Sequence, residues 1–168
     1  MKYIKTLASI FILVLIDQFT KNLATTYLMD QEPIPIIKGV FELQYLENRG
    51  MAFGLFQNQR ILFVIVTILI LGVIGFCYLR IPDIKRYNPL KIVTIVIFAG
   101  AIGNFIDRML NGFVVDFFYF KLIDFPVFNM ADIYVTVSGF SLFILVLFYY
   151  KGENDFDFLN FKLKQRGE

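Results

Sequence analysis

Residues 100–132 read GAIGNFIDRMLNGFVVDFFYFKLIDFPVFNMAD and connect two apolar segments of the chain, residues 90–110 and 130–150. Only Arg108 and Lys121 balance the carboxylates within this stretch. The carboxylates are all aspartates: Asp107, Asp116, Asp124 and Asp132. A carboxylate beside a bilayer is energetically costly and is seldom kept there without a use. These side chains are therefore the first candidates for a functional site.

The composition indicates an integral membrane protein. Of the 168 residues, 58% are hydrophobic and 18% are charged, whereas an average soluble domain has about 25% charged residues. A chain of this length suits one compact unit. Cys77 is the one cysteine, and there is no histidine. A single cysteine excludes an internal disulfide. The lack of histidine excludes a Ser-His-Asp triad, a Cys-His pair and an HExxH zinc site. Hydrolytic chemistry must then rest on carboxylates, or on lysine with serine or threonine.

Several apolar segments are long enough to cross a bilayer as helices. Residues 61–79 contain no charged residue and are bounded by Arg60 and Arg80. The N-terminal segment has a basic start and an apolar centre, as a cleaved signal peptide does, but no small-x-small cleavage site follows. The expected spans are about 6–28, 61–79, 90–110 and 130–150.

The segments between the spans differ in character. In residues 31–60, a turn at Gly39 is followed by VFELQYL, whose apolar and polar residues alternate as in a short strand. We expect an extended platform there, at the membrane surface, and a loop at 111–129. The predicted fold is an all-α membrane protein with four transmembrane helices and a small extended β platform on its outer face. Residues 1–150 would form a single four-span membrane domain, followed by a cytoplasmic tail at 151–168.

The positive charges set the expected orientation, because loops rich in lysine and arginine stay in the cytoplasm. Of the 16 lysines and arginines, ten lie in the N-terminus, the loop at 80–91 and the tail, and four lie in the other two loops. Both termini are therefore expected in the cytoplasm. The third span then runs outward and the fourth runs back, which brings Asp107, Asp116 and Asp132 to the outer face.

Asp17 and Lys21 lie four residues apart in the first span, so they share one helix face. Each would cost about 2.5–3.5 kcal/mol at the bilayer centre, and pairing reduces that cost. Two interpretations remain open. The pair either neutralises itself and fixes helix packing, or it lines a polar cavity shared with the other helices.

The third span ends with GAIGNFIDR, which combines small and polar residues. Gly100 and Gly103 allow another helix or a ligand backbone to approach closely. Asn104 and Arg108 are four residues apart and share a face. Asp107 beside Arg108 is either a structural ion pair, or Arg108 holds an acidic group or a carbonyl of a substrate.

Asp116 and Asp132 are the candidate catalytic pair. Asp116 lies in VVDFF, where apolar neighbours desolvate the carboxyl and raise its pKa. Asn129 and Asp132 lie in FNMAD and have the spacing of a capping box. Capping does not explain Asp116, and a cap can also orient a catalytic carboxylate. Two carboxylates held close together cannot both ionise easily, so one keeps its proton and the other acts as a base. Such a pair can activate water against a peptide carbonyl and protonate the leaving amine without a metal.

Five short blocks give the chain a resemblance to the lipoprotein signal peptidase family, also called signal peptidase II. The blocks follow the family's order from the first span to the fourth: DQFTK (17–21), NRGMAFG (48–54), GAIGNFIDR (100–108), VVDFF (114–118) and FNMAD (128–132). Each block alone is weak, whereas five in order are highly specific. Met51 departs from the pattern, because a smaller residue is expected at that position.

The resemblance implies an intramembrane aspartyl endopeptidase of the bacterial cytoplasmic membrane. Such enzymes remove signal peptides from prolipoproteins, cutting before a cysteine that already bears a diacylglyceryl group. The resemblance implies that Asp116 and Asp132 are catalytic and that residues 33–47 belong to a platform that cradles the lipidated substrate. The implied substrate-positioning or site-supporting residues are Asp17, Lys21, Asn48, Gly50, Asn104, Asp107, Arg108 and Asn129. The expected partners are diacylglyceryl-modified prolipoproteins and membrane lipids; no cofactor, metal or nucleic acid is expected, and the protein is expected to be a monomer.

Two other classes of protein remain as alternatives. A small transporter or proton channel also keeps aspartate and lysine inside the membrane. Such proteins often contain internal repeats, which this sequence does not show, and here the polar groups gather towards one membrane face. A non-enzymatic membrane scaffold would have no need of Asp116.

Overall fold

Four long helices make up most of the described protein. The computed structural model describes residues 2–50 and 59–160, and within this part four helices have the length and apolar composition needed to cross a membrane. They are α1 (Lys2–Leu28), α2 (Arg60–Arg80), α3 (Asn88–Leu110) and α4 (Met130–Ile144), the last continued by the π-helical turn η4 (Leu145–Tyr149). The predicted fold with four membrane-spanning helices is confirmed.

The surfaces of these helices suit a lipid environment. α2 has no buried residue, although nearly all of its side chains are apolar. Leu69 on α2 is 64% exposed and Phe140 on α4 is 66% exposed. Lipid solvates such side chains, while each helix satisfies its own backbone N–H and C=O groups internally.

Local sequence signals fix where α3 and α4 begin. Pro89 stands in the first turn of α3, where its missing N–H leaves no hydrogen bond unmade. Asn129 caps α4: its side chain accepts a hydrogen bond from the backbone N–H of Asp132, while the Asp132 carboxylate accepts one from the backbone N–H of Asn129. The predicted capping box is confirmed, and it fixes Asp132 in the first turn of α4.

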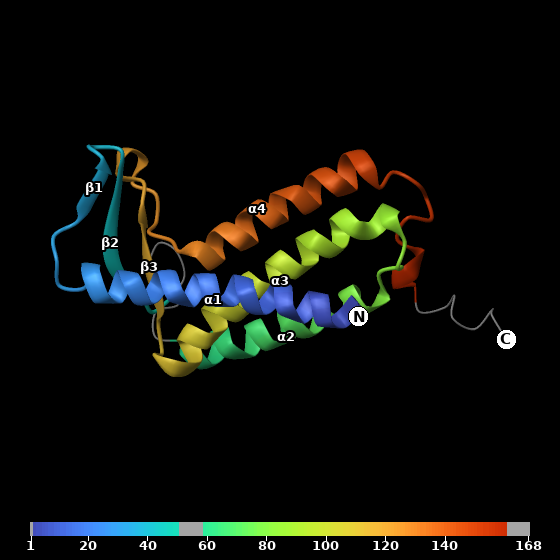
Figure 1. The fold of residues 1–168 in the computed structure, drawn as a ribbon, viewed down its shortest axis with the longest axis horizontal. Helices are drawn as coiled ribbons and strands as arrows, with labels where there is room; N and C mark the ends of the chain where they lie inside the picture. The colour runs from blue at the N-terminus through green and yellow to red at the C-terminus, as the bar shows by residue number, and fades with distance from the viewer. Residues whose placement is uncertain (1, 51–58, 161–168) are drawn as a thin grey trace.

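α3 packs against the other three long helices (Figure 1). Two glycines of α3 lie in tight contact with neighbouring helices. A Cβ atom at Gly100 would lie 2.6 Å from the backbone oxygen of Ala131 on α4. A Cβ atom at Gly103 would clash with the carboxylate of Asp17 on α1. The prediction that these glycines admit neighbouring helices is therefore confirmed.

A small antiparallel sheet lies at one end of the helices (Figure 1). Its strand order is β1 (Ile34–Ile37), β2 (Phe41–Asn48) and β3 (Val114–Tyr119). The expected β platform is present, but the prediction of a loop throughout 111–129 is wrong, because β3 comes from it. Val114, Val115, Asp116 and Phe117 are all buried. A strand buried on both faces lacks the alternation of apolar and polar residues that reveals a half-buried strand.

The register of the sheet connects β2 to the start of α4. Leu43 pairs with Phe118 and Leu46 pairs with Asp116, so β2 has one more residue than β3 between these pairs. Such a bulge bends the strand and redirects side chains. Phe118 also forms a backbone bridge with Phe128, which directly precedes the cap of α4. The sheet therefore holds Asp116 close to the first turn of α4.

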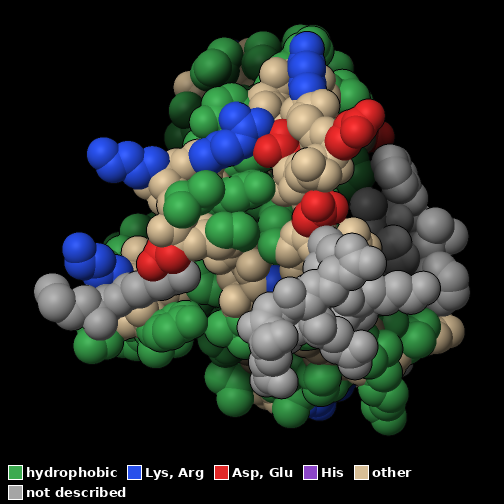
Figure 2. All heavy atoms as spheres, turned by 90° about the vertical axis from the view of Figure 1, so that its right-hand side faces the viewer, with side chains coloured by type: hydrophobic (Ala, Val, Ile, Leu, Met, Phe, Trp, Pro, Cys, Tyr) green, Lys and Arg blue, Asp and Glu red, His purple; other side chains and the backbone are tan. Residues whose placement is uncertain are grey.

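The opposite end of the molecule contains the start of α1 and residues 150–160 (Figure 1). Figure 2 shows this end, where lysine and arginine side chains gather together with acidic ones. Arg86 donates to both carboxylate oxygens of Asp155, at 2.9 and 2.7 Å, and Tyr150 is buried. The first part of the expected polar tail thus folds against the helix ends, and residues 161–168 lie outside the described part.

Candidate active site

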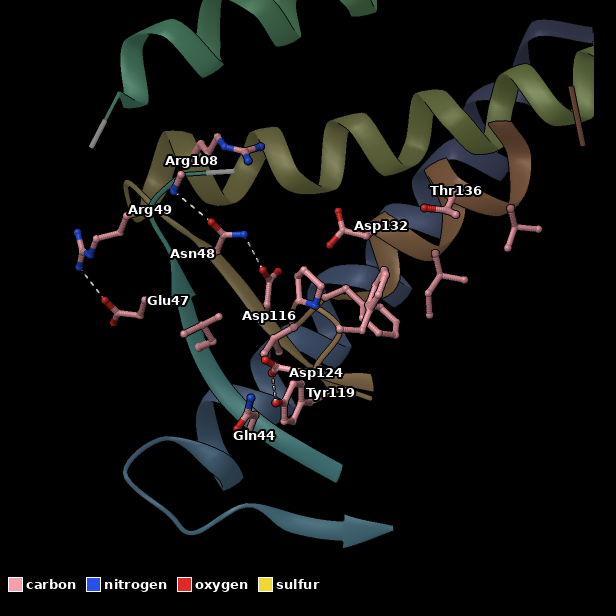
Figure 3. A pocket seen from close by; sticks show the side chains of 18 residues that line it. Gln44, Glu47, Asn48, Arg49, Arg108, Asp116, Tyr119, Asp124, Asp132 and Thr136 are labelled. Carbon is pink, nitrogen blue, oxygen red and sulfur yellow. Dashed lines mark hydrogen bonds and ion pairs between the residues drawn. The ribbon is translucent and has the colours of Figure 1, made fainter. Parts of the chain in front are cut away.

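A cavity of about 1060 Å³ opens where the sheet meets α3 and α4 (Figure 3). Its wall is formed by the end of β2, by β3, by residues 124–128 and by the first turns of α4. Asp116 and Asp132 both lie on this wall, together with Arg108 from α3. The fold therefore brings the two predicted catalytic carboxylates to one cavity from two different elements.

The alternation of side chains along β3 directs Asp116 towards the cavity. Val115 and Phe117 pack against the apolar side chains of α1, so the side chain between them faces the other way. Asp116 is 1% exposed. Its Oδ2 accepts a hydrogen bond from Asn48 Nδ2 at 2.8 Å, and its Oδ1 accepts one from Asn129 Nδ2 at 2.6 Å.

Asp132 reaches the cavity from the first turn of α4. Its Oδ2 accepts the backbone N–H of Asn129 at 3.1 Å as part of the capping box. Its Oδ1 accepts a hydrogen bond from Asn104 Nδ2 at 2.8 Å. The Asn129 side chain also donates to Asn104 Oδ1 at 3.1 Å, so a chain of amides links the two carboxylates. Capping and a role at the cavity are compatible for Asp132.

The surroundings raise the pKa of Asp116 from 3.8 to about 7. Burial is the main cause, because it penalises the charged carboxylate, and the negative charge of Asp132 adds to it. Hydrogen bonds from Asn48 and Asn129 and the charge of Lys21 lower the pKa and offset part of this shift. Asp116 therefore keeps its proton in acid and releases it near neutral pH, as acid–base catalysis requires. The predicted upward shift is confirmed.

A buried ionic cluster lies behind the carboxylates. Lys21 is 3% exposed, and its Nζ lies 3.0 Å from Asp17 Oδ2 and 3.1 Å from Asp107 Oδ2. It also donates to Asn104 Oδ1 at 2.9 Å. Asp17 Oδ1 in turn accepts the backbone N–H of Ala131 at 2.9 Å. The contacts favour the first interpretation of the Asp17–Lys21 pair, since the two residues bind each other and link α1 to α3 and α4. Asp107 shares in the neutralisation, and neither Asp17 nor Lys21 is among the residues that line the cavity.

The structure divides the predicted site residues into two groups. On the wall of the cavity are Asn48, Gly50, Arg108, Asp116 and Asp132. Behind the wall are Asp17, Lys21, Asn104, Asp107 and Asn129. The second group holds the first in place and makes no part of the cavity surface. Met51 lies outside the described residues, as do all of residues 51–58.

Asp107 pairs with Lys21 and not with its neighbour Arg108. Its Oδ2 also accepts the backbone N–H of Val115 at 3.1 Å. The Arg108 guanidinium lies over the ring of Phe63 on α2, 5.0 Å from the ring centre. Successive helical residues point about 100° apart, which sends these two side chains to different neighbours. Of the two alternatives for Asp107 and Arg108, the structural ion pair is therefore not formed.

Gln18 and residues 124–128 also contribute to the site, although the sequence does not single them out. Gln18 donates from Nε2 to Asp107 Oδ1 at 2.9 Å and so fastens α1 to α3; its place inside the DQFTK block was the available signal. Residues 124–128 form part of the cavity wall. The hydroxyl of Tyr119 donates to Asp124 Oδ1 at 2.5 Å and anchors this segment (Figure 3). No motif marks the segment in the sequence.

Paired carboxylates, one of which titrates near neutral pH, can pass protons to and from a water molecule. Here the pair lies at one end of a bundle of membrane-spanning helices. This fold and site define a membrane-embedded hydrolase of the aspartic type. Residues 9–148 match the family model described as signal peptidase (SPase) II. The chain belongs to the signal peptidase II family.

Named relatives and solved structures agree with this assignment. The chain is 45% identical to the lipoprotein signal peptidase of Clostridioides difficile (strain 630) over 140 residues, which is 83% of this chain and 93% of the relative. It is 44% identical to the lipoprotein signal peptidase of Streptococcus thermophilus (strain CNRZ 1066) over 149 residues, 87% of this chain and 92% of the relative. A solved structure described as a bacterial membrane enzyme, determined by the in meso method at 2.3 Å resolution, is similar with a TM-score of 0.78 and 31% identity, over 89% of this chain and 92% of its own.

Proposed function

We propose that this protein removes signal peptides from prolipoproteins and cuts just before a cysteine that bears a diacylglyceryl group. The observation that carries the proposal is the presence of Asp116 and Asp132 on the wall of one cavity, in a chain of the signal peptidase II family. The alternative of a small transporter or proton channel is not favoured by the family to which the chain belongs.

In the proposed reaction Asp116 begins with a proton and Asp132 begins without one. Asp132 takes a proton from a water molecule while the water oxygen attacks the carbonyl carbon of the scissile bond, and Asp116 protonates the carbonyl oxygen. When the intermediate collapses, the C–N bond breaks and the leaving amine takes the proton held by Asp132. Asp116 recovers its proton from the hydroxyl group. The pKa of about 7 at Asp116 supports its place as the initial acid.

The cavity wall supports lateral entry of a lipid-bearing substrate. Ile133, Thr136 and Val137 continue the wall along α4 beyond the carboxylates, and Val137 is 58% exposed on the helix surface. Acyl chains can therefore stay in the bilayer while the peptide reaches the two carboxylates. Arg108 lies on the same wall, where its guanidinium can hold a carbonyl or an acidic group of the substrate.

We place the cavity on the outer side of the bacterial cytoplasmic membrane, with both termini of a monomer in the cytoplasm. Ten of the 16 lysines and arginines belong to the termini and the 80–91 loop, and segments rich in these residues stay on the cytoplasmic side. The sheet and the cavity lie at the other end of the helices. An enzyme with this orientation meets its substrates after their export.

The proposal is tested by offering the purified protein a prolipoprotein with and without its diacylglyceryl group. We expect cleavage of the modified form before its cysteine, identified by mass spectrometry, and little cleavage of the unmodified form. A chelator should leave the rate unchanged, since no metal takes part in the proposed reaction. Equal cleavage of both forms would contradict the lipid requirement, and a failure to cut either form would contradict the proposed function.

A further inference from the structure

Each of the four oxygens of the carboxylate pair accepts one hydrogen bond from the protein. For Asp116, Asn129 Nδ2 donates to Oδ1 at 2.6 Å and Asn48 Nδ2 donates to Oδ2 at 2.8 Å. For Asp132, Asn104 Nδ2 donates to Oδ1 at 2.8 Å and the backbone N–H of Asn129 donates to Oδ2 at 3.1 Å. Three of these four donors are side-chain amides, whose other end is an acceptor.

The orientation of each amide follows from what binds its oxygen. Asn48 Oδ1 accepts the backbone N–H of Gly50 at 3.1 Å, and Asn129 Oδ1 accepts that of Asp132 at 3.0 Å. Asn104 Oδ1 accepts the Lys21 ammonium at 2.9 Å. A backbone N–H and an ammonium can only donate. Each amide oxygen is therefore held away from the carboxylates, and each NH₂ group is turned towards them.

Lys21 is itself fixed in place. Asp17 and Asp107 neutralise its buried charge from two helices, at 3.0 and 3.1 Å. A buried ammonium without such partners would be strongly unfavourable, and the two carboxylates hold the Lys21 side chain in the position from which it donates to Asn104. Through hydrogen bonds, Lys21 is connected to Asp132 by this amide, because Asn104 accepts from Lys21 and donates to Asp132.

The other charged groups on the cavity wall do not place a hydrogen-bond acceptor against Asp116 or Asp132. Arg108, which comes from α3, is also a pure donor. Glu47 of β2 is bound to Arg49 at 2.6 Å, and Asp124 accepts the hydroxyl of Tyr119. The groups that hydrogen-bond to Asp116 and Asp132 in the described part of the protein are thus all donors.

We propose that Lys21 and two backbone amides fix the three asparagines as a donor-only cage, so that the proton of the carboxylate pair passes only between Asp116, Asp132, water and the substrate. This proposal rests on the proposed function and deepens it. Within it, Lys21 and Asn104 are positioning residues: they keep an acceptor from facing Asp132, where it would compete for the proton.

Asn104→Asp tests the cage, because it keeps the size of the side chain and the acceptor for Lys21 but turns an oxygen towards Asp132. We expect kcat/KM at pH 7 to fall at least tenfold, with partial recovery in acid, where the introduced carboxyl regains a proton and can donate again. Asn129→Asp preserves an N-cap oxygen and turns an acceptor towards Asp116. Asn129→Asp should show the same shift of the pH optimum towards acid. It provides the test if Asn104→Asp does not fold.

The control is Asn22→Asp, which adds the same charge one residue from Lys21 on the exposed face of α1 and should leave the pH profile unchanged. Wild-type pH profiles in folded Asn104→Asp and Asn129→Asp would overturn the cage, and so would an equal loss of rate at every pH. These outcomes are independent of the proposed function, which is settled separately by whether the wild type cuts the lipid-modified substrate.

Discussion

At the scale of single residues, Asp116 and Asp132 have different surroundings because they lie on different elements, a strand and a helix. Asp116 lies in a buried strand, where loss of water raises its pKa to about 7. Asp132 lies in the first turn of α4, where the N-terminal end of the helix favours negative charge. Two residues of the same type therefore suit the separate roles of acid and base.

Asn48→Ala should move the basic limb of the pH–rate profile to higher pH. The hydrogen bond from Asn48 lowers the pKa of Asp116, so its loss raises that pKa above about 7 and Asp116 keeps its proton longer. A hydrogen bond to a charged group contributes about 1.5–3 kcal/mol, which corresponds to a shift of about one to two pH units. The measurement is kcat/KM against pH in detergent.

Gln44→Ala is the matched control, since Gln44 lies on the same strand and the same cavity wall but makes no hydrogen bond to Asp116. Its basic limb should stay where it is in the wild type. A basic limb that is unchanged or lowered in Asn48→Ala would contradict the role of this hydrogen bond. The apparent pKa values will belong to the carboxylate pair as a unit.

At the scale of elements, the site depends on how closely α3 approaches its neighbours. Lys21 and Asp17 come from α1, Asn104 and Asp107 from α3, and Asp132 from α4. Hydrogen bonds of about 3 Å tolerate little displacement of these helices. Small residues on α3 are therefore as necessary to the network as its polar side chains.

Gly103→Ala should destabilise the protein, because the added methyl group would clash with the Asp17 carboxylate. Overpacking of this kind costs about 1–3 kcal/mol, and activity should fall as Asp17 moves. Gly139→Ala on α4 is the control, since a Cβ atom there meets nothing within 4 Å and alanine favours the helix. Thermal unfolding in detergent compares the two, and a Gly103→Ala variant as stable as Gly139→Ala would refute the packing argument.

The elements that the sequence predicts well are those with a strong local pattern. Long, largely apolar segments reveal the four spans, and FNMAD reveals the cap that holds Asp132. β3 has no such pattern, because its buried residues are apolar on both faces around Asp116. Asp107 forms its ion pair with Lys21 on another helix. Residues so far apart in the sequence show no spacing pattern from which their pairing could be predicted. Residues 124–128 line the cavity because of where this segment runs in the fold, and no sequence motif predicts that path.

At the scale of the whole molecule, the carboxylate pair lies at the opposite end of the helices from the loop at 80–91 and the start of α1 (Figure 1). The carboxylate pair is near the sheet, and lysine and arginine side chains of the described residues gather at the other end (Figures 1 and 2). Positively charged loops remain in the cytoplasm. The proposed orientation therefore exposes the cavity to the outer side, where the substrates would arrive.

Reporter fusions test this orientation. Fusions at residue 85 and at the C-terminus should report the cytoplasm, and fusions near residues 40 and 121 should report the outer side. The expectation follows from the asymmetry of ten lysines and arginines against four. A C-terminus found on the outer side would put the cavity on the wrong face for the proposed function.

The catalytic roles of Asp116 and Asp132 are tested most directly by Asp132→Asn, assayed in detergent on the lipid-modified prolipoprotein at protein levels matched to the wild type. Asparagine keeps the size of the side chain and still leaves an oxygen for the cap, so the protein should fold and insert. It cannot exchange the proton that the reaction needs, and cleavage should fall by roughly 10²–10⁴-fold. Asp116→Asn should lose as much, and the double variant should be little worse, because the two groups act as one unit. Substantial cleavage by Asp132→Asn would contradict the catalytic assignment.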